Sequence, residues 1–466
     1  MNRSANMLRG SLWSSLITYT IPIMLTGLLQ LLFNAADLVV VGRFSGSINV
    51  AAVSATGAIT NLIVNLFIGL SVGAGVATAH GLGGNQALDV HRTVHTALPT
   101  ALVGGVILTI VGVIFSEDFL TLMKTPENVL PLSSLYMRIY FCGMTFTMVY
   151  NFCASILRAA GDTKTPLLFL TIAGVINVLL NIFFVVVLHM TVDGVALATI
   201  ISQGISSVLI VIALMRRTDA CRLSLKKMRF YKQPFLKIIR IGLPAGIQGS
   251  MFAISNVIIQ SSVNAFNSDA LMSGNGAAAN IEGFVYVLMN SFHQTAVNFT
   301  GQNLGAHQYQ RIKKIFAICI LYVSIAGIIA GASVWYFGER LLGIYITDSQ
   351  EAIRLGLIRF NYIALPYFVC GLMDVSTGAL RGLGASITPM LISIMGVCGI
   401  RILWIYTIFQ VPRFHTPECL YLSYLISWAV TFLFQTISFI IIYRRRVRAD
   451  QTIPHMPELK KQGERI

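Results

Sequence analysis

One acidic residue stands out in the first apolar run of the chain. Asp37 lies late in a segment that begins near Ser14 and holds no earlier charge. A run of this length is typical of a membrane-spanning helix. A carboxylate inside such a helix costs about 2.5–3.5 kcal/mol on insertion scales, so it is kept where it lines a cavity, pairs with another group or binds an ion. Alternatively, Asp37 reaches the outer surface, because Arg43 and Ser45 follow closely. We interpret Asp37 as an ion-coupling residue that binds a proton or Na⁺.

Amide side chains recur beside this acid and in other apolar segments. Gln30 and Asn34 precede Asp37 and form a stripe with it. Asn177 and Asn181 are four residues apart, so they share one helix face and are predicted to join Asp37 in the coupling site. Asn151 and Thr199 are the further candidates for the lining of the same pocket. The alternative is hydrogen bonding between helices without an ion, worth about 0.6 kcal/mol per contact.

The second half of the chain carries fewer charged groups within its apolar segments. Glu282 lies near the outer end of one segment and alternatively reaches solvent, whereas Asp374 is deeper. Arg401 is the one cation that we place inside a helix. Its least costly arrangement is an ion pair with Asp374 or Glu282. This structural pair is the alternative to a role for the three residues in lining a cavity.

Pro22 interrupts the first apolar segment upstream of Asp37. Proline removes a backbone hydrogen bond and permits a kink. We expect Pro22 to act as a hinge in the helix that carries the acid; the alternative is a static kink.

The composition indicates a protein with many membrane spans. The 466 residues are 55% hydrophobic and 11% charged, with a mean hydropathy of +0.75, whereas soluble domains carry about 25% charged residues. The net charge of +15 does not indicate nucleic-acid binding, because Lys and Arg gather on alternate loops. That bias predicts cytoplasmic termini and a cytoplasmic central linker. The seven cysteines show no metal-ligand spacing, so we expect no cofactor and no metal site beyond a possible Na⁺ at Asp37.

Twelve apolar segments are predicted to be the transmembrane helices of an all-α membrane protein. Their spans are 12–41, 50–78, 92–115, 129–157, 165–188, 194–216, 237–266, 275–300, 311–337, 354–380, 388–411 and 418–443. The predicted units are residues 1–215, a basic cytoplasmic linker at 216–236, residues 237–443 and a polar cytoplasmic tail at 444–466.

Motifs of the first half return in the second half. Leu157-Arg158-Ala159-Ala160-Gly161 is followed by Thr-Pro, and so is Leu380-Arg381-Gly382-Leu383-Gly384; Leu82-Gly83 matches Leu304-Gly305, and Pro22 matches Pro244. The offset is always 222 or 223 residues. Six helices per repeat is an even number, so both halves insert the same way up. The repeat predicts two parallel six-helix bundles related by a pseudo-two-fold axis along the membrane normal.

These features together resemble the multidrug and toxic compound extrusion (MATE) family over about residues 12–443. The resemblance rests on the repeat, on Pro22 followed by Asp37-Leu38-Val39-Val40-Val41-Gly42, and on the paired turns. It implies a V-shaped cleft and a cation site at Asp37 supported by Gln30, Asn151, Asn177, Asn181 and Thr199. Some relatives have an acid at the position of Asn181, and some sodium-driven members have one at the position of Phe252 and near Cys370. In the second half, the candidates for the lining are Asn256, Gln260, Glu282, Asp374 and Arg401.

We therefore expect an ion-driven exporter, not an enzyme, that moves small amphiphilic or cationic compounds across the cell membrane in exchange for H⁺ or Na⁺. Its expected partners are the substrate and the bilayer, and we expect a monomer. The alternative is a flippase for lipid-linked precursors. A pyrophosphate head group would require a strongly basic cleft, and Arg401 alone does not supply one.

Overall fold

In the part that the computed structural model describes, residues 7–347 and 349–451, the chain forms helices joined by turns and short loops, and no strand occurs. The α-helices are α1 (Leu12–Phe44), α2 (Ser47–Gly83), α3 (Ala87–Leu122), α4 (Leu130–Cys142), α5 (Met144–Ala159), α6 (Lys164–Ile182), α7 (Val192–Met215), α8 (Lys232–Asn264), α9 (Asp269–Gly305), α10 (Tyr309–Tyr336), α11 (Gly338–Tyr345), α12 (Gln350–Arg359), α13 (Phe368–Gly382), α14 (Ile387–Ser393), α15 (Ile400–Tyr406) and α16 (Pro417–Gln451). Short π- and 3₁₀-segments continue α6 to Val187, join α12 to α13, join α14 to α15 and extend α15 to Gln410.

Most of these helices meet the length and composition expected of membrane spans. Within the described residues, ten spans qualify, and there are eleven if α4 and α5, which are bent by 47° at Gly143, count as one. Each of the twelve predicted segments coincides with one helix or with one broken helix. The span that does not qualify is α9, because its 37 residues include Asn275, Glu282 and His293 among several polar side chains.

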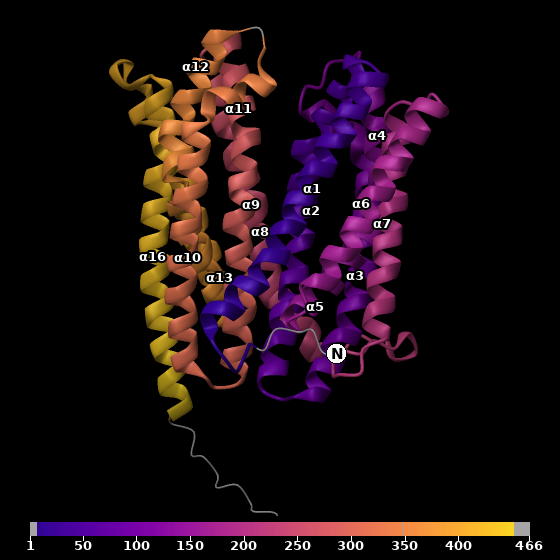
Figure 1. The fold of residues 1–466 in the computed structure, drawn as a ribbon, viewed down its shortest axis with the longest axis vertical. Coiled ribbons are helices and arrows are strands. Elements are labelled where there is room, and N and C mark those ends of the chain that lie inside the picture. The colour runs from indigo at the N-terminus through magenta and orange to yellow at the C-terminus, as the bar shows by residue number, and fades with distance from the viewer. Residues whose placement is uncertain (1–6, 348, 452–466) are drawn as a thin grey trace, which may run out of the picture.

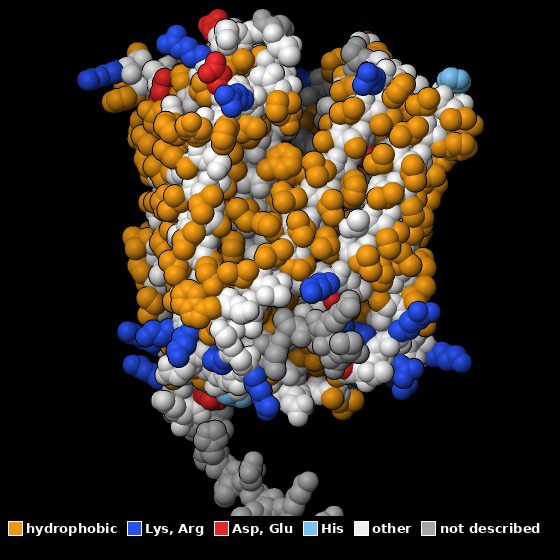
Figure 2. All heavy atoms as spheres, in the orientation of Figure 1, with side chains coloured by type: hydrophobic (Ala, Val, Ile, Leu, Met, Phe, Trp, Pro, Cys, Tyr) orange, Lys and Arg blue, Asp and Glu red, His pale blue; other side chains and the backbone are white. Residues whose placement is uncertain are grey.

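The helices form two groups that meet near the middle of the molecule. Figure 1 shows α3 to α7 on one side, α10, α12, α13 and α16 on the other, and α1, α2, α8 and α9 between them. Figure 2 shows a broad apolar band around the molecule, with Lys and Arg gathered at the end near the N-terminus. At the opposite end, a hollow separates the two groups.

The repeated motifs have repeated geometry. α1 and α8 each contain 33 residues, and α2 and α9 each contain 37. The turns after α2 and α9 both hold a non-glycine residue at positive φ, Asn85 at 52° and His307 at 55°. The turns after α5 and α13 both use a glycine, Gly161 at 87° and Gly384 at 78°. Two turns of the same type at the same repeat positions support an internal duplication.

The two groups pack directly against each other where α2 crosses α8. A Cβ added to Gly69 would lie 2.1 Å from the backbone nitrogen of Gly246, and a Cβ added to Gly73 would lie 2.2 Å from the carbonyl oxygen of Ile238. Small residues of this kind allow helix backbones to approach each other in a membrane protein. The glycines therefore bring the two halves into direct backbone contact.

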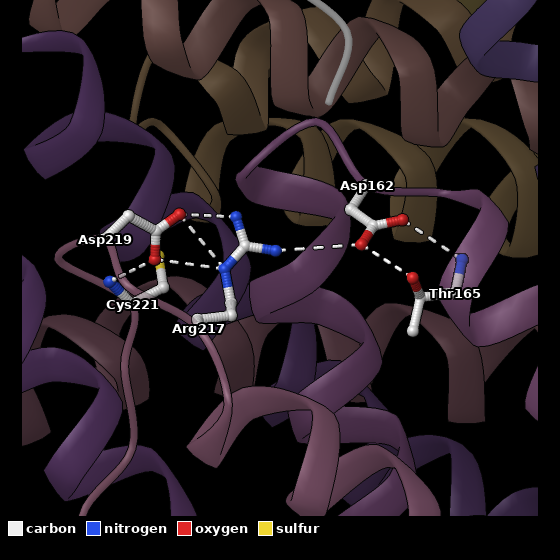
Figure 3. Close-up of polar contacts among 5 residues, drawn as sticks. All are labelled: Asp162, Thr165, Arg217, Asp219 and Cys221. Carbon is white, nitrogen blue, oxygen red and sulfur yellow. Dashed lines mark hydrogen bonds and ion pairs between the residues drawn. The ribbon is translucent and has the colours of Figure 1, made fainter. Parts of the chain in front are cut away.

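The segment between α7 and α8 is tied to the first half by an arginine (Figure 3). Arg217 forms an ion pair with Asp219, and its NH1 lies 3.7 Å from Oδ2 of Asp162. Asp162 accepts hydrogen bonds from the backbone nitrogen (3.0 Å) and the hydroxyl (2.7 Å) of Thr165, at the start of α6. Partial burial alone would raise the pKa of the Asp219 carboxyl, but the hydrogen bond and charge of Arg217 outweigh it and hold that pKa below its usual value.

Two helices extend into the predicted linker and tail. α8 begins at Lys232, inside the predicted linker, and α16 continues to Gln451, inside the predicted tail. Residues 452–466 of that tail lie outside the described part of the chain.

Candidate functional site

The two halves enclose a cavity of about 600 Å³. It is lined by residues of α1, α2, α4, α5, α6 and α7 from the first half and of α8, α9 and α13 from the second. Aromatic and other apolar side chains lie among the polar ones, including Phe33, Met144, Phe252 and Tyr286. A cavity of this size and mixed lining is typical of a site for a small organic molecule.

Asp37 lies in the wall of this cavity, where three helices of the first half converge. Nδ2 of Asn181, on α6, donates a hydrogen bond of 2.5 Å to Oδ1 of Asp37 on α1. The same amide lies 3.2 Å from Oδ1 of Asn177, whose own Nδ2 is 3.5 Å from the hydroxyl of Thr199 on α7. Asp37 is half-buried, whereas Asn181 is fully buried. The predicted convergence of Asp37 with these three side chains is therefore present.

The chemistry of this cluster suits a small hard cation. Carboxylate, amide and hydroxyl oxygens are the ligands that such cations prefer. Oδ1 of Asn181 is buried and has no hydrogen-bond partner within the described residues. An oxygen of this kind is costly to bury alone, and a bound cation would satisfy it. A proton on Asp37 is the alternative occupant. No cluster of three or more His, Cys, Asp or Glu side chains with metal-binding geometry occurs in the described ranges.

The other residues predicted for the first half also reach the cavity. Gln30, Asn34 and Asn151 all line it. The side chain of Asn151 is turned back to its own helix, where Nδ2 donates to the carbonyl of Thr147 at 2.8 Å. Pro22 lies within α1, which continues unbroken from Leu12 to Phe44, so the hinge at Pro22 stays a prediction.

Of the five residues predicted to line the second half, only Asp374 borders the cavity. Its side chain is 6% exposed, and Oδ2 has no hydrogen-bond partner within the described residues. Asn256 and Gln260 lie on exposed positions of α8 outside the cavity. Gln260 instead accepts a hydrogen bond of 2.8 Å from Asn275.

The alternative considered for Arg401, an ion pair with Asp374 or Glu282, is absent from the described part of the structure. Glu282 is buried and pairs with Arg359, with NH2 of the arginine 2.7 Å from Oε2 of the glutamate. Arg401 instead donates from Nε to the hydroxyl of Ser427 at 3.0 Å and lies 3.9 Å from the ring centroid of Tyr424. Arg359 rather than Arg401 reaches Glu282, because Arg359 ends α12 and this helix packs against α9, which carries the glutamate. Neither Glu282 nor Arg401 borders the cavity.

The sequence analysis missed two basic residues at this site. Arg158 and Arg381 were named only as parts of the repeated turns, yet both side chains line the cavity. Arg158 donates from NH1 to Oε1 of Gln294 at 2.8 Å. Arg381, only 8% exposed, donates from NH2 to Oε1 of Gln248 at 2.8 Å. The signal that would have found them is the repeat itself, because the same arginine returns in both Leu-Arg motifs.

Hydrogen bonds between the halves close the cavity toward the N-terminal end. Nε2 of His80 on α2 lies 2.8 Å from the carbonyl oxygen of Gly382, and Nε2 of Gln302 on α9 donates to the carbonyl of Ala159 at 2.6 Å. His80 and Gln302 occupy equivalent positions of the repeat. A Cβ added to Gly83 would lie 1.9 Å from the carbonyl oxygen of Gln302. The hollow at the other end (Figure 2) therefore marks the side on which the two halves stand apart.

The sequence matches the profile of one protein family, MatE, over residues 22–183 and 244–407. The chain is 28% identical over 396 residues to the probable multidrug resistance protein YpnP of Bacillus subtilis (strain 168), which covers 84% of this chain and 87% of that protein. It is 25% identical over 381 residues to the FAD transporter of Shewanella oneidensis, covering 79% of this chain and 82% of the relative. The fold matches a crystal structure of MATE in complex with MaL6, with a TM-score of 0.88 and 19% identity over 97% of this chain and 100% of that chain.

Proposed function

The chain belongs to the MATE family of multidrug efflux transporters, and on that premise we propose that it exports amphiphilic, often cationic organic compounds in exchange for H⁺ or Na⁺. One observation carries this proposal: Asp37 stands in the wall of a cavity that both halves line, hydrogen-bonded to an amide of another helix. A cation bound to this carboxylate would lie at the wall of the same cavity that holds the substrate. The similarity to an FAD transporter and to multidrug export proteins supports a transporter over an enzyme.

Our proposal for the architecture is twelve transmembrane helices in two parallel six-helix bundles, residues 1–215 and 237–443. The matching turn geometry and helix lengths of the two halves support it. Both termini and the linker at 216–236 would be cytoplasmic, because Lys and Arg gather at that end of the apolar band (Figure 2). The protein would act as a monomer in the cell membrane.

In this scheme, a cation bound at Asp37 favours one arrangement of α1 and so releases the substrate. Pro22 is the proposed hinge, because it leaves the carbonyl group one turn before it without a backbone donor. One elementary charge moved through 100 mV provides about 2.3 kcal/mol, and a tenfold concentration ratio costs about 1.4 kcal/mol. One cation at about 150–180 mV therefore sustains two to three decades of substrate gradient.

The second candidate function is a flippase for a lipid-linked precursor. The two cavity arginines favour it, because an anionic head group needs positive charge at its site. Asp37 argues against the flippase, because its carboxylate adds negative charge to the cavity wall. Lipid-linked sugar retained by the purified protein would favour the flippase.

The test is substrate-stimulated ion flux in proteoliposomes, with the sodium and pH gradients imposed separately. We expect flux under one of the two gradients and its loss in Asp37→Asn. The matched control is Asp118→Asn, at an exposed position of α3, which should transport as the unsubstituted protein does. Gradient-dependent export that persists in Asp37→Asn would contradict the proposal.

A further inference from the structure

Two arginines at equivalent positions of the repeat form the basic part of the cavity lining. Arg158 lies in the last turn of α5 and Arg381 in the last turn of α13, each within the repeated Leu-Arg motif. Both side chains border the central cavity. Since the motif recurs with its arginine in both halves, each half contributes one cation to the cavity lining. We call this pair the arginine floor.

The two guanidinium groups are held against the same turn of α9. NH1 of Arg158 donates to Oε1 of Gln294 at 2.8 Å, and NH1 of Arg381 lies 3.3 Å from Nε2 of His293, the preceding residue. The Nδ1 of His293 is 2.8 Å from the carbonyl oxygen of Asp374, so Nδ1 carries the proton and Nε2 accepts from the arginine. A neutral histidine adds no charge to the floor. The contacts therefore orient both guanidinium groups without neutralising them.

No acid pairs with either arginine within the described residues. The five ion pairs found there involve other residues. Asp374 is seven residues before Arg381 on the same face of α13 and also lines the cavity, but it lies beyond ion-pair distance of the arginine. Neither arginine therefore has an acid in direct contact, although the charge of Asp374 acts on Arg381 through space.

Arg381 also has a hydrogen-bond donor without an acceptor in the described part of the chain. A guanidinium has five N–H groups. Arg381 donates to Gln248 and His293, while its Nε has no partner within the described residues and the side chain is only 8% exposed. A buried donor without an acceptor is costly, and a charged one more so. The unused Nε–H and its neighbouring N–H groups match the geometry of a carboxylate or phosphate.

We propose that the arginine floor is a binding site for an oxyanion, a carboxylate or phosphate, carried by the transported compound. This inference rests on the proposed export function and narrows its substrate class to amphiphiles that bear an acidic group as well as an apolar or cationic body. The acidic group binds at Arg158 and Arg381. The body lies along the apolar and aromatic lining, which includes Phe33 and Phe252.

The alternative is that the arginines only hold the halves together. The contact of Arg158 with Gln294 does join them, since α5 belongs to the first half and α9 to the second. The contacts of Arg381, however, lie within the second half, on α8 and α9. A bridging role therefore does not account for Arg381.

The test compares two dyes that differ in one charge. A rhodamine with a free benzoate and its methyl ester share the same ring system, so the ratio of their affinities isolates the carboxylate. Fluorescence anisotropy of each dye with the purified full-length protein in neutral-lipid nanodiscs gives both affinities. We expect the acid to bind more tightly than the ester. We expect this preference to fall about 10-fold to 100-fold in Arg381→Gln and in Arg158→Gln, the range of one charge-assisted hydrogen bond.

Controls separate the charge effect from loss of fold. Arg381→Lys should retain part of the preference, and Arg138→Gln, at an exposed arginine paired with Glu117, should retain all of it. Because the result is a ratio of two dyes on one variant, partial unfolding cancels. Equal affinity for both dyes in the unsubstituted protein, or a preference unchanged in both cavity variants, overturns the inference.

Two further arms assign the source of the anion and keep the proposals separate. Nanodiscs with anionic lipid should leave the preference of the unsubstituted protein unchanged; its disappearance there would assign the floor to a lipid head group and overturn the inference. Gradient-driven export of the methyl ester in proteoliposomes tests the export function alone. If the ester is exported but the acid is not preferred, the oxyanion site at the arginine floor is contradicted and the proposed export function is not.

Discussion

The Nδ2 of Asn181 donates a hydrogen bond of 2.5 Å to Oδ1 of Asp37, and this contact joins α6 to α1. The two residues are 144 positions apart in the chain. Asn181 also contacts Asn177 through the same amide, so the position of the acid is linked to a polar chain that reaches α7 through Thr199. A change at Asp37 therefore affects hydrogen bonds that connect three helices of the first half, α1, α6 and α7.

Asn181→Ala should weaken the binding of the coupling cation. The substitution removes the donor to Asp37 and a buried oxygen beside it, a loss of about 1–3 kcal/mol, or roughly 5-fold to 100-fold in affinity. The measurement is the H⁺ or Na⁺ concentration that gives half-maximal export in proteoliposomes. Asn256→Ala is the matched control, since Asn256 lies outside the cavity. An equal shift in both variants would show that the Asn181 amide has no specific role in binding the coupling cation.

Glu282→Gln should destabilise the second half strongly. The substitution leaves Arg359 buried without its acid, and breaking a buried pair costs about 3–5 kcal/mol. Glu117→Gln breaks an exposed pair with Arg138 and should cost less than about 1 kcal/mol. Thermal unfolding of both variants in the same detergent checks the difference. Similar melting temperatures would show that the Arg359 contact contributes no more than a surface pair.

Gly73→Ala should push α2 away from α8. The new Cβ would lie 2.2 Å from the carbonyl oxygen of Ile238, and crowding of this kind typically costs about 1–3 kcal/mol. Gly57→Ala on the same helix has no atom within 4 Å of the new Cβ, so it should be neutral or slightly stabilising. The readouts are thermal stability and export rate. A Gly73→Ala protein as stable as Gly57→Ala would show that the crossing is looser than described.

Arg217→Gln should lower stability at neutral pH but not in acid. Because Arg217 holds the pKa of Asp219 below its usual value, the pair stabilises the fold above the unfolded pKa of about 3.9 and loses that effect as pH falls through the lower folded value. Asp219 is largely exposed, so we expect less than about 1 kcal/mol.

The check for this linker contact is thermal unfolding across pH 7 to 3 for Arg217→Gln and for Arg216→Gln, which alters the exposed neighbouring arginine. The deficit of the Arg217 variant should shrink at the acid end. A deficit that is constant with pH would assign the effect to packing rather than to the charge of Asp219.

Much of the candidate site in the first half was predictable. Helix spacing places four polar residues on inward faces: Asp37, Asn177, Asn181 and Thr199. A charged or amide side chain in an apolar membrane segment almost always faces the interior of the helix bundle or a cavity. The second half was predicted less well. Glu282 and Arg401 are equally conspicuous in the sequence, but Arg359 lies close to the start of the predicted segment 354–380 and was not considered as a partner for Glu282.

The amino-acid sequence by itself determined the helices, their apolar length and the internal repeat, because these depend on local composition and on spacing along the chain. Only the tertiary structure decided which buried charges meet. Arg359 rather than Arg401 reaches Glu282, and Arg158 and Arg381 turn into the cavity rather than toward solvent. The physical reason is that the partner of a buried charge depends on how helices distant in the sequence pack and cross. The composition of one helix does not specify which helix packs against it.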